Sequence, residues 1–240
     1  DAARRAGATT VLVGLGGSAT VDGGAGALTA LGYRLRVADG SGLKIGGGEL
    51  HRLDRIEATW VGDWSGVEVE LLADVRTRLL DAPRRFGPQK GATPDMVRRL
   101  EAGLEVFADV VERDIGVSLR DVEGSGAAGG LGFGLAAGLN GTIVDGARRI
   151  AELLGLPALL EDADVLVVGE GELDATSGDG KVVGTLVDLA RHHDVGVVAV
   201  VGNLAEDLPG IDQVEQAGWG DGNARRAVVE AARRLATTMG

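Results

Sequence analysis

The residues best suited to chemistry lie at 169–174, where the sequence reads GEGELD, and a glycine–lysine pair follows at 180–181. Glu170 and Asp174 supply carboxylates in this group, and Lys181 supplies an amine. This combination suits Mg²⁺ held by carboxylates and substrate phosphates, with the lysine neutralising charge. The alternative is a charged surface loop with no catalytic function.

A glycine-rich loop at residues 14–24, GLGGSATVDGG, is the second candidate site. Glycine allows backbone N–H groups to point at an anion, so the loop predicts a cradle for phosphate. Asp22 could hold Mg²⁺ or accept a substrate proton, or it could cap a helix. The G-x-G-x-x-A pattern at 14–19 also leaves a dinucleotide-binding oxidoreductase open, and a tight strand-to-helix turn is the structural alternative.

Two further segments carry candidate ligand contacts. In FGPQKGA at 86–92, Lys90 precedes an expected helix N-terminus, where free amides and the helix dipole favour an anion. A capping loop with a solvated lysine is the alternative there. In GSGAAGGLG at 124–132, glycine is too dense for a good isolated helix. Either two elements cross at close range in this segment, or a ligand lies against its backbone.

Alternating strands and helices are expected to position these segments. Apolar runs typical of strands buried on both faces of a parallel sheet occur at 10–15, 67–73, 164–168 and 195–201. Helical patterns occur at 93–113, 148–154, 182–192 and 223–238. The first helix has Thr93 as its N-cap and Pro94 at its first position. The sequence therefore predicts an α/β fold, in which ligands bind beyond the carboxyl ends of the strands.

Composition limits the classes of function. The 240 residues include 41 glycines and no cysteine, and 36 acidic against 24 basic residues give a net charge of -12. This balance argues against a nucleic-acid partner, which would require a basic surface. No apolar stretch resembles a membrane span or a signal peptide, so we expect a cytoplasmic protein with no membrane partner. Residues 1–7 resemble the last turns of a helix, which predicts a chain cut from a longer protein.

Taken in order, the glycine-rich segments resemble the bacterial glycerate kinase family. The family's G-[IL]-G-G-S-A-T-x-D-G-G-A-G and F-G-P-Q-K-G-A segments are matched at 14–26 and 86–92. Its G-A-G-A-A-G-G-[LM]-G segment is matched at 124–132 with one serine for alanine, and its G-E-G-x-x-D followed by G-K is matched from 169 to 181. The resemblance covers essentially the whole chain. It implies ATP-dependent phosphorylation of D-glycerate, with ATP and Mg²⁺ as cofactors, in a cleft between two α/β lobes of which the first is incomplete.

The resemblance also implies which residues form the site, and we infer their roles from residue type. The expected catalytic residues are Asp22, Asp174 and Lys181, and the expected metal ligands are Asp74 and Glu170. The expected contacts to substrate or nucleotide are Gly16, Gly17, Ser18, Gly23, Gly24, Lys90, Gly126, Gly129, Gly130, Gly169 and Gly171.

We expect residues 1–160 to form the central α/β lobe and residues 161–240 the C-terminal part of the second lobe, whose N-terminal part is absent from this chain. The expected partners are glycerate and ATP, and a homodimer is compatible with the sequence. The sequence also departs from the family pattern at Glu172, and the truncated start together with the departures at Arg76 and Thr176 leaves open a nucleotide-binding or regulatory module that has lost catalysis.

Overall fold

The computed structural model describes residues 1–174, 177, 182–218 and 224–238 and divides into two compact units, 1–146 and 147–240. Each unit has a hydrophobic core of its own. The sequence places the boundary after residue 160, whereas the structure places it at Gly146. The reason is packing, because Ala151 and Leu160 are buried in the core of the second unit.

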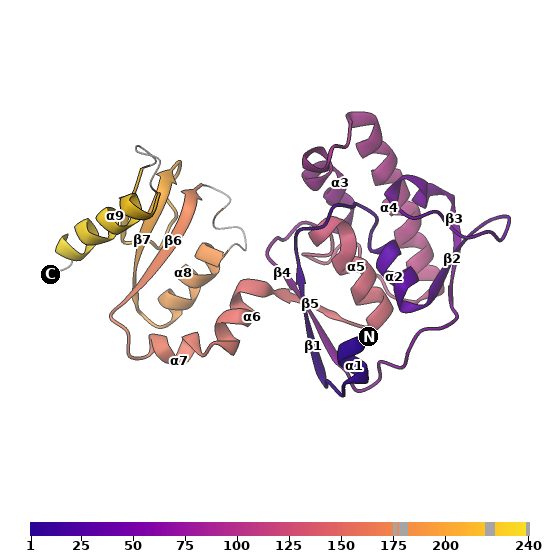
Figure 1. Cartoon of the computed structure of the whole chain (residues 1–240), viewed down its shortest axis with the longest axis horizontal. Helices are drawn as coiled ribbons and strands as arrows, with labels where there is room; N and C mark the ends of the chain where they lie inside the picture. Colours follow the sequence, from indigo (N-terminus) through magenta and orange to yellow (C-terminus); the bar gives the residue numbers. More distant parts are fainter. Residues whose placement is uncertain (175–176, 178–181, 219–223, 239–240) are drawn as a thin grey trace. The chain divides into compact units, whose positions relative to one another are not determined.

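The first unit contains a parallel sheet of three strands in the order β1-β4-β5. Its strands are β1 (Thr10–Leu15), β4 (Glu68–Ala73) and β5 (Thr142–Asp145), as Figure 1 shows. This confirms the strands predicted at 10–15 and 67–73. The register pairs Leu15 with Ala73, so the segments that follow β1 and β4 leave the same edge of the sheet.

One expectation about this sheet is wrong. The sequence predicts strands buried on both faces, but Leu12 of β1 is 39% exposed. Val13 and Leu15 point the other way and pack in a core shared with Leu135 and Leu139 of α5 (Ala127–Leu139). The cause is that successive side chains of a strand alternate between faces, and α5 packs on the face opposite Leu12.

Helix α4 (Pro94–Asp114) forms as predicted. Its N-cap is Thr93, whose hydroxyl accepts a hydrogen bond from the Met96 amide at 3.3 Å. The apolar stripe of the helix buries Leu104, Phe107 and Val111. The ring of Phe107 meets the ring of Phe133 in α5 edge-on, with centroids 5.7 Å apart. The contact places α4 against α5 in the main core of the first unit.

An antiparallel pair of strands in the first unit was not predicted. It consists of β2 (Tyr33–Val37) and β3 (Leu53–Ala58), which pair with a register irregularity near Val37. Charged residues occupy the outward positions, so neither strand forms a continuous apolar run. The remaining short elements are α1 (Ala2–Arg5), α2 (Ala25–Leu31), α3 (Ala82–Phe86) and the 3-10 helices η1 (Gly47–Arg52), η2 (Leu79–Asp81) and η3 (Pro88–Lys90).

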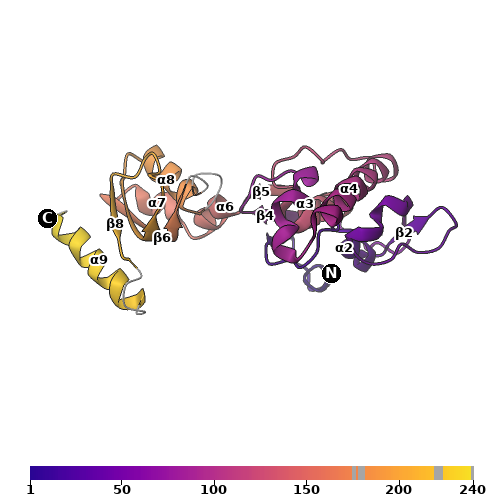
Figure 2. The ribbon, with the colours of Figure 1, turned by 90° about the horizontal axis from the view of Figure 1, so that it is seen from above.

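The second unit is a parallel sheet with helices on both sides. Its strands, in the order β6-β7-β8, are β6 (Val165–Leu173), β7 (Gly196–Leu204) and β8 (Gln213–Gln216). Figures 1 and 2 show this sheet between α8 (Val182–His192) and α9 (Ala224–Thr238). Helices α6 (Gly146–Leu153) and α7 (Leu156–Leu160) precede it. The predicted strands and helices of this half are confirmed, and the fold is α/β in both units.

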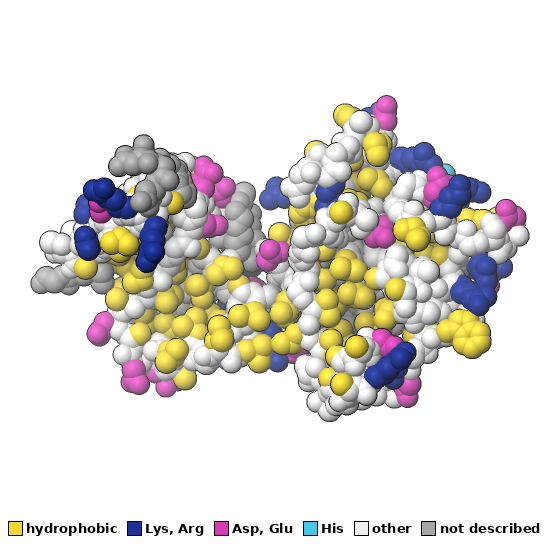
Figure 3. Space-filling view, viewed as in Figure 1, with side chains coloured by type: hydrophobic (Ala, Val, Ile, Leu, Met, Phe, Trp, Pro, Cys, Tyr) yellow, Lys and Arg dark blue, Asp and Glu magenta, His cyan; other side chains and the backbone are white. Residues whose placement is uncertain are grey.

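The surface of the second unit is partly apolar. Figure 3 shows hydrophobic surface over α6, α7 and β6. These elements carry the exposed side chains Ile150, Leu153, Leu159 and Val167, and the exposed Leu154 directly follows α6. Within the described ranges, no helix is both long and apolar enough to cross a bilayer.

Candidate functional site

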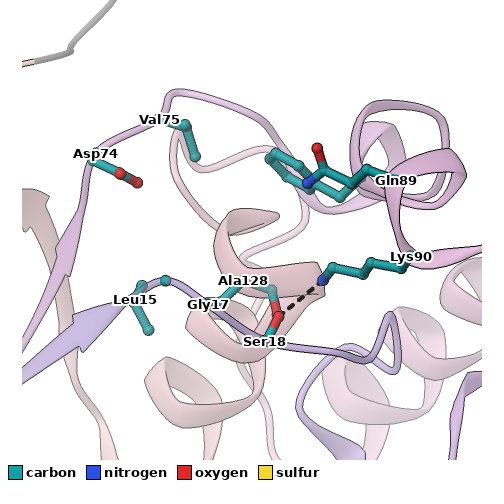
Figure 4. Close-up of a pocket in the computed structure, with 10 residues that line it drawn as sticks. Leu15, Gly17, Ser18, Asp74, Val75, Gln89, Lys90 and Ala128 are labelled. Atoms are coloured by element: carbon teal, nitrogen blue, oxygen red, sulfur yellow. Dashed lines mark hydrogen bonds between the residues drawn. The ribbon is translucent and has the colours of Figure 1, made fainter. Parts of the chain in front are cut away.

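A pocket of about 240 Å³ lies in the first unit beyond the carboxyl ends of β1 and β4. Four stretches that are far apart in the sequence line it, and Figure 4 shows them together. The lining residues are Leu15, Gly16, Gly17, Ser18, Asp74, Val75, Phe86, Gln89, Lys90 and Ala128. This is the position at which parallel sheets bind ligands. The structure thus brings Gly16, Gly17, Ser18, Asp74 and Lys90, five of the residues predicted for the site, to one place.

Lys90 is held by two hydrogen bonds at the edge of this pocket. Its ammonium donates to the Ser18 hydroxyl at 2.9 Å and to the Thr20 carbonyl at 2.7 Å. Burial lowers the pKa of Lys90 below its usual 10.5, and the nearby Asp22 carboxylate opposes that shift. An ammonium has three N–H donors, so one remains for a ligand. A partly desolvated ammonium with a free donor is well suited to bind an anion.

The Ser18 hydroxyl links Lys90 to the start of α5. It donates its proton to the Ala128 carbonyl at 2.6 Å while it accepts from Lys90. Ala128 adopts φ 54 and ψ 34, a left-handed conformation that is uncommon for a residue with a Cβ. Strain of this kind is characteristic of functional sites, where the surrounding structure maintains it. Here it aims the Ala128 carbonyl at Ser18.

Asp74 brings the opposite charge to the pocket. It is exposed and directly follows β4. In Figure 4 its carboxylate and the Lys90 ammonium approach the pocket from opposite sides. Arg76, one of the departures from the family pattern, lies nearby in the sequence but pairs with Glu123 at 3.9 Å, and both side chains are exposed. Neither of these two residues lines the pocket.

The predicted glycine contacts divide into two groups. A Cβ placed on Gly16 or Gly17 would meet no atom within 4 Å, so this stretch is open to a ligand. A Cβ on Gly23 would lie 2.6 Å from the Phe107 ring, and one on Gly24 would lie 2.9 Å from the Cα of Gly134. Gly23 and Gly24 therefore face protein atoms, and their role as ligand contacts stays a prediction.

The glycines at 124–132 also face protein. A Cβ on Gly126 would lie 2.3 Å from the Arg78 carbonyl oxygen, and one on Gly129 would lie 2.0 Å from that of Thr20. A Cβ on Gly130 would lie 2.6 Å from the Cα of Gly23. Of the two alternatives that the sequence left open, the close crossing of two elements is present at these three positions.

Asp22 is buried, with 7% of its surface exposed, at the start of α2. One carboxylate oxygen accepts the Gly24 amide and the other accepts the Gly26 amide, each at 3.1 Å. This arrangement is close to the helix-capping alternative, and Asp22 does not line the pocket. Because α2 begins only at Ala25, the G-x-G-x-x-A pattern does not open the helix, as a dinucleotide site would require.

The carboxylates predicted in the second unit lie on and after β6. Oε2 of Glu170 is buried and has no hydrogen-bond partner among the described residues. Asp174 accepts a hydrogen bond from the Ser177 hydroxyl at 3.4 Å, and its amide donates to the same hydroxyl at 3.1 Å. A Cβ placed on Gly169 would lie 3.4 Å from the Val200 carbonyl oxygen, whereas a Cβ on Gly171 would meet no atom within 4 Å. Lys181 and Thr176 lie outside the described residues.

The Glu170 carboxylate suits a metal ion that is also bound by substrate phosphates. Within the described parts of the chain, no three His, Asp or Glu side chains lie close enough to form a metal site of their own. Mg²⁺ in kinases is commonly held by one or two carboxylates together with substrate phosphates. The orphaned oxygen of Glu170 fits that requirement, because a buried carboxylate oxygen is costly without a partner.

Some pocket residues were missed by the sequence analysis. Phe86 and Gln89 stand in the same segment as Lys90, so the spacing of that segment was a usable signal. Val75 follows Asp74 at the end of β4. No feature of the sequence identifies Ala128 as a pocket residue, because nothing in its residue type indicates a left-handed backbone.

Parallel sheets, open glycines and an anchored lysine at the strand ends are features typical of an α/β protein with an anion-binding pocket. Comparison with known proteins identifies the family. The model of the glycerate kinase family matches residues 1–239, and the chain belongs to this family. Among similar proteins are the glycerate kinase of Bacillus subtilis (strain 168), 38% identical, and the glycerate 2-kinase of Escherichia coli (strain K12), 35% identical. Each alignment covers 88% of this chain and 56% of the relative.

A solved structure with a similar fold comes from the same family. The crystal structure of a glycerate kinase 2 from Salmonella typhimurium LT2 superposes with a TM-score of 0.79 at 35% identity. It matches 99% of this chain, which covers 66% of that structure. The chain thus spans about half the length of the curated relatives that it matches.

Proposed function

We propose that this protein transfers the γ-phosphoryl group of ATP to a hydroxyl group of D-glycerate. The observation that carries the proposal is the pocket at the ends of β1 and β4, where open glycines, a partly desolvated lysine and a carboxylate converge. Membership of the glycerate kinase family supports the same conclusion. The E. coli relative is named a glycerate 2-kinase, so we expect 2-phosphoglycerate as the product.

In the proposed reaction, the hydroxyl oxygen forms a bond to the γ-phosphorus as the bridging bond to ADP breaks, and the hydroxyl proton is released. Phosphoryl transfer depends mainly on positioning and charge neutralisation. Mg²⁺, when bound, would neutralise charge on the transferred group, and Glu170 is its proposed ligand because of the orphaned oxygen. Asp174 and Lys181 remain the proposed catalytic residues of the second unit. Asp22 is proposed to hold the glycine loop, since amides occupy both of its oxygens.

The test is a coupled ADP-release assay with ATP, Mg²⁺ and D-glycerate, run on this chain and on the longest form of the protein that contains it. Phosphorus NMR of the product distinguishes 2-phosphoglycerate from 3-phosphoglycerate. We expect ADP release that depends on D-glycerate. If the longest form consumes no ATP with either glycerate isomer, the proposal fails.

The second candidate is a nucleotide-binding module without catalysis. The observation that favours it is Arg76, a departure from the family pattern whose side chain pairs with Glu123 and does not enter the pocket. Tight ATP binding without ADP release would support this candidate. Glycerate-dependent turnover would exclude it.

A further inference from the structure

The pocket at the ends of β1 and β4 is bipolar. Among the described residues that line it, Lys90 is the one cation and Asp74 the one anion, and the others are neutral. Figure 4 shows these two groups on opposite sides. A ligand that matches such a pocket has a single negative charge at one end and a neutral hydrogen-bond donor at the other.

We infer that this pocket binds the hydroxy acid and not the nucleotide, with the acid's carboxylate on Lys90 and its hydroxyl donating to Asp74. The inference rests on the proposed function and names the substrate of this particular pocket. It also replaces the metal-ligand role that the sequence predicts for Asp74.

The charge of the pocket favours the hydroxy acid over the nucleotide. A nucleotide polyphosphate carries several negative charges and would meet the Asp74 carboxylate with one ammonium to offset it. Like charges in a partly desolvated pocket repel. The hydroxyl of a hydroxy acid, in contrast, donates a charge-assisted hydrogen bond to a carboxylate.

The size of the pocket fits a small ligand. The pocket measures about 240 Å³, below the roughly 300–1,000 Å³ of sites for drug-sized ligands. A nucleoside triphosphate is at least as large as such ligands, whereas a short hydroxy acid is much smaller.

Ser18 is the positioning residue of this arrangement. Its proton goes to the Ala128 carbonyl, so it can only accept from Lys90, and this fixes the direction of the ammonium. The third N–H of Lys90 then remains for the carboxylate. The open backbone beside Gly16 and Gly17 leaves room for the rest of the ligand.

The experiment uses lysine resonances, because the sequence contains only Lys44, Lys90 and Lys181. The protein is labelled with ¹³C at lysine Cε, and the signals are assigned with Lys44→Arg and Lys181→Arg variants. D-glycerate, propionate and ATP without Mg²⁺ are titrated separately. We expect D-glycerate to move the Lys90 signal and raise the Lys90 pKa, propionate to bind more weakly because it lacks the hydroxyl, and ATP to leave the signal unmoved.

Variants test the two ends of the pocket. Lys90→Met should weaken D-glycerate binding by about tenfold or more, the worth of one charge-assisted hydrogen bond. The matched control is Lys44→Met, an exposed lysine outside the pocket, which should leave binding unchanged. Asp74→Asn should lower the preference for D-glycerate over propionate. Ser18→Ala should weaken binding of both acids, and Ser18→Thr should restore it.

Two outcomes overturn the inference, and both can be read on the unaltered protein. One is a Lys90 signal that ATP moves and D-glycerate does not. The other is D-glycerate binding, measured by calorimetry, that leaves the Lys90 signal in place. The outcomes are separable from the proposed function. D-glycerate bound at Lys90 without turnover would refute the kinase activity alone, and turnover without a response of Lys90 would refute the pocket assignment alone.

Discussion

Replacing Asp22 by alanine tests whether this carboxylate holds the glycine loop or takes part in chemistry. Its two oxygens accept the amides of Gly24 and Gly26 at 3.1 Å each, and its surface is 7% exposed. In Asp22→Ala, both amides at the start of α2 lose their acceptor. Water has little access to replace it, so we expect a loss of stability in the first unit.

The magnitude follows from the two bonds. Loss of a side-chain acceptor at a helix start costs about 0.5–2 kcal/mol, and a hydrogen bond to a charged group contributes about 1.5–3 kcal/mol. Because the two bonds share one carboxylate, their contributions overlap, and we expect a loss of about 2–4 kcal/mol. Asp22→Asn keeps one acceptor oxygen, so it should lose about half as much.

The assay is urea unfolding followed by tryptophan fluorescence. Trp60 and Trp64 lie in the first unit, and a Trp219→Phe background removes the third tryptophan of the sequence. The control is Asp63→Ala, an exposed carboxylate that accepts one amide, from Ser65, at 2.8 Å. Asp63→Ala should lower the free energy of unfolding by less than about 1 kcal/mol. An Asp22→Ala variant as stable as the parent protein but without kinase activity would refute the structural role and place Asp22 in the chemistry.

Three further predictions concern the same unit. Gly129→Ala should lower the free energy of unfolding by about 3 kcal/mol or more, because the new Cβ would lie 2.0 Å from the Thr20 carbonyl oxygen. Gly17→Ala, whose Cβ meets nothing, should cost only about 1–2 kcal/mol for its positive φ, and equal urea midpoints for the two would contradict this reasoning. Ala128→Gly should raise stability by up to about 1 kcal/mol, since relief of the left-handed strain exceeds the added chain entropy, and a lower midpoint would count against the strain. Burial raises the pKa of Tyr33, the single tyrosine, above 10.0. The unfolded chain therefore ionises first and stability should fall as pH rises above about 10; a phenolate titration at the ordinary pKa would refute this.

The fold could be predicted where one kind of pattern dominated. Continuous apolar runs located β1, β4, β6 and β7, and a capped amphipathic stripe located α4. The pair β2 and β3 was missed because its outward positions carry Arg and Glu and its inward positions are few. Their stability comes from burying Leu35 and Ile56 in the core that α4 shares, which is a tertiary contact that local sequence does not display.

Some residues of the candidate site could be predicted, but its geometry could not. The sequence identified Ser18, Lys90 and Asp74 as chemically suited residues, and the structure places all three on one pocket. The sequence could not show that Gly16 is open to a ligand and that Gly129 faces protein, because the two have the same residue type and similar neighbours. The separation depends on what lies beside each Cα in three dimensions, which is open space in one case and the Thr20 carbonyl oxygen in the other.

The crossing of the two glycine-rich segments explains why Lys90 can be held so firmly. The Thr20 carbonyl that accepts from Lys90 lies directly against Gly129, and the Ala128 carbonyl that accepts from Ser18 precedes that same glycine. Both acceptors are therefore fixed by one backbone-to-backbone contact that only glycine permits. A lysine positioned before its ligand arrives loses less conformational freedom on binding. The glycines at this crossing thus position the carbonyls that direct the ammonium.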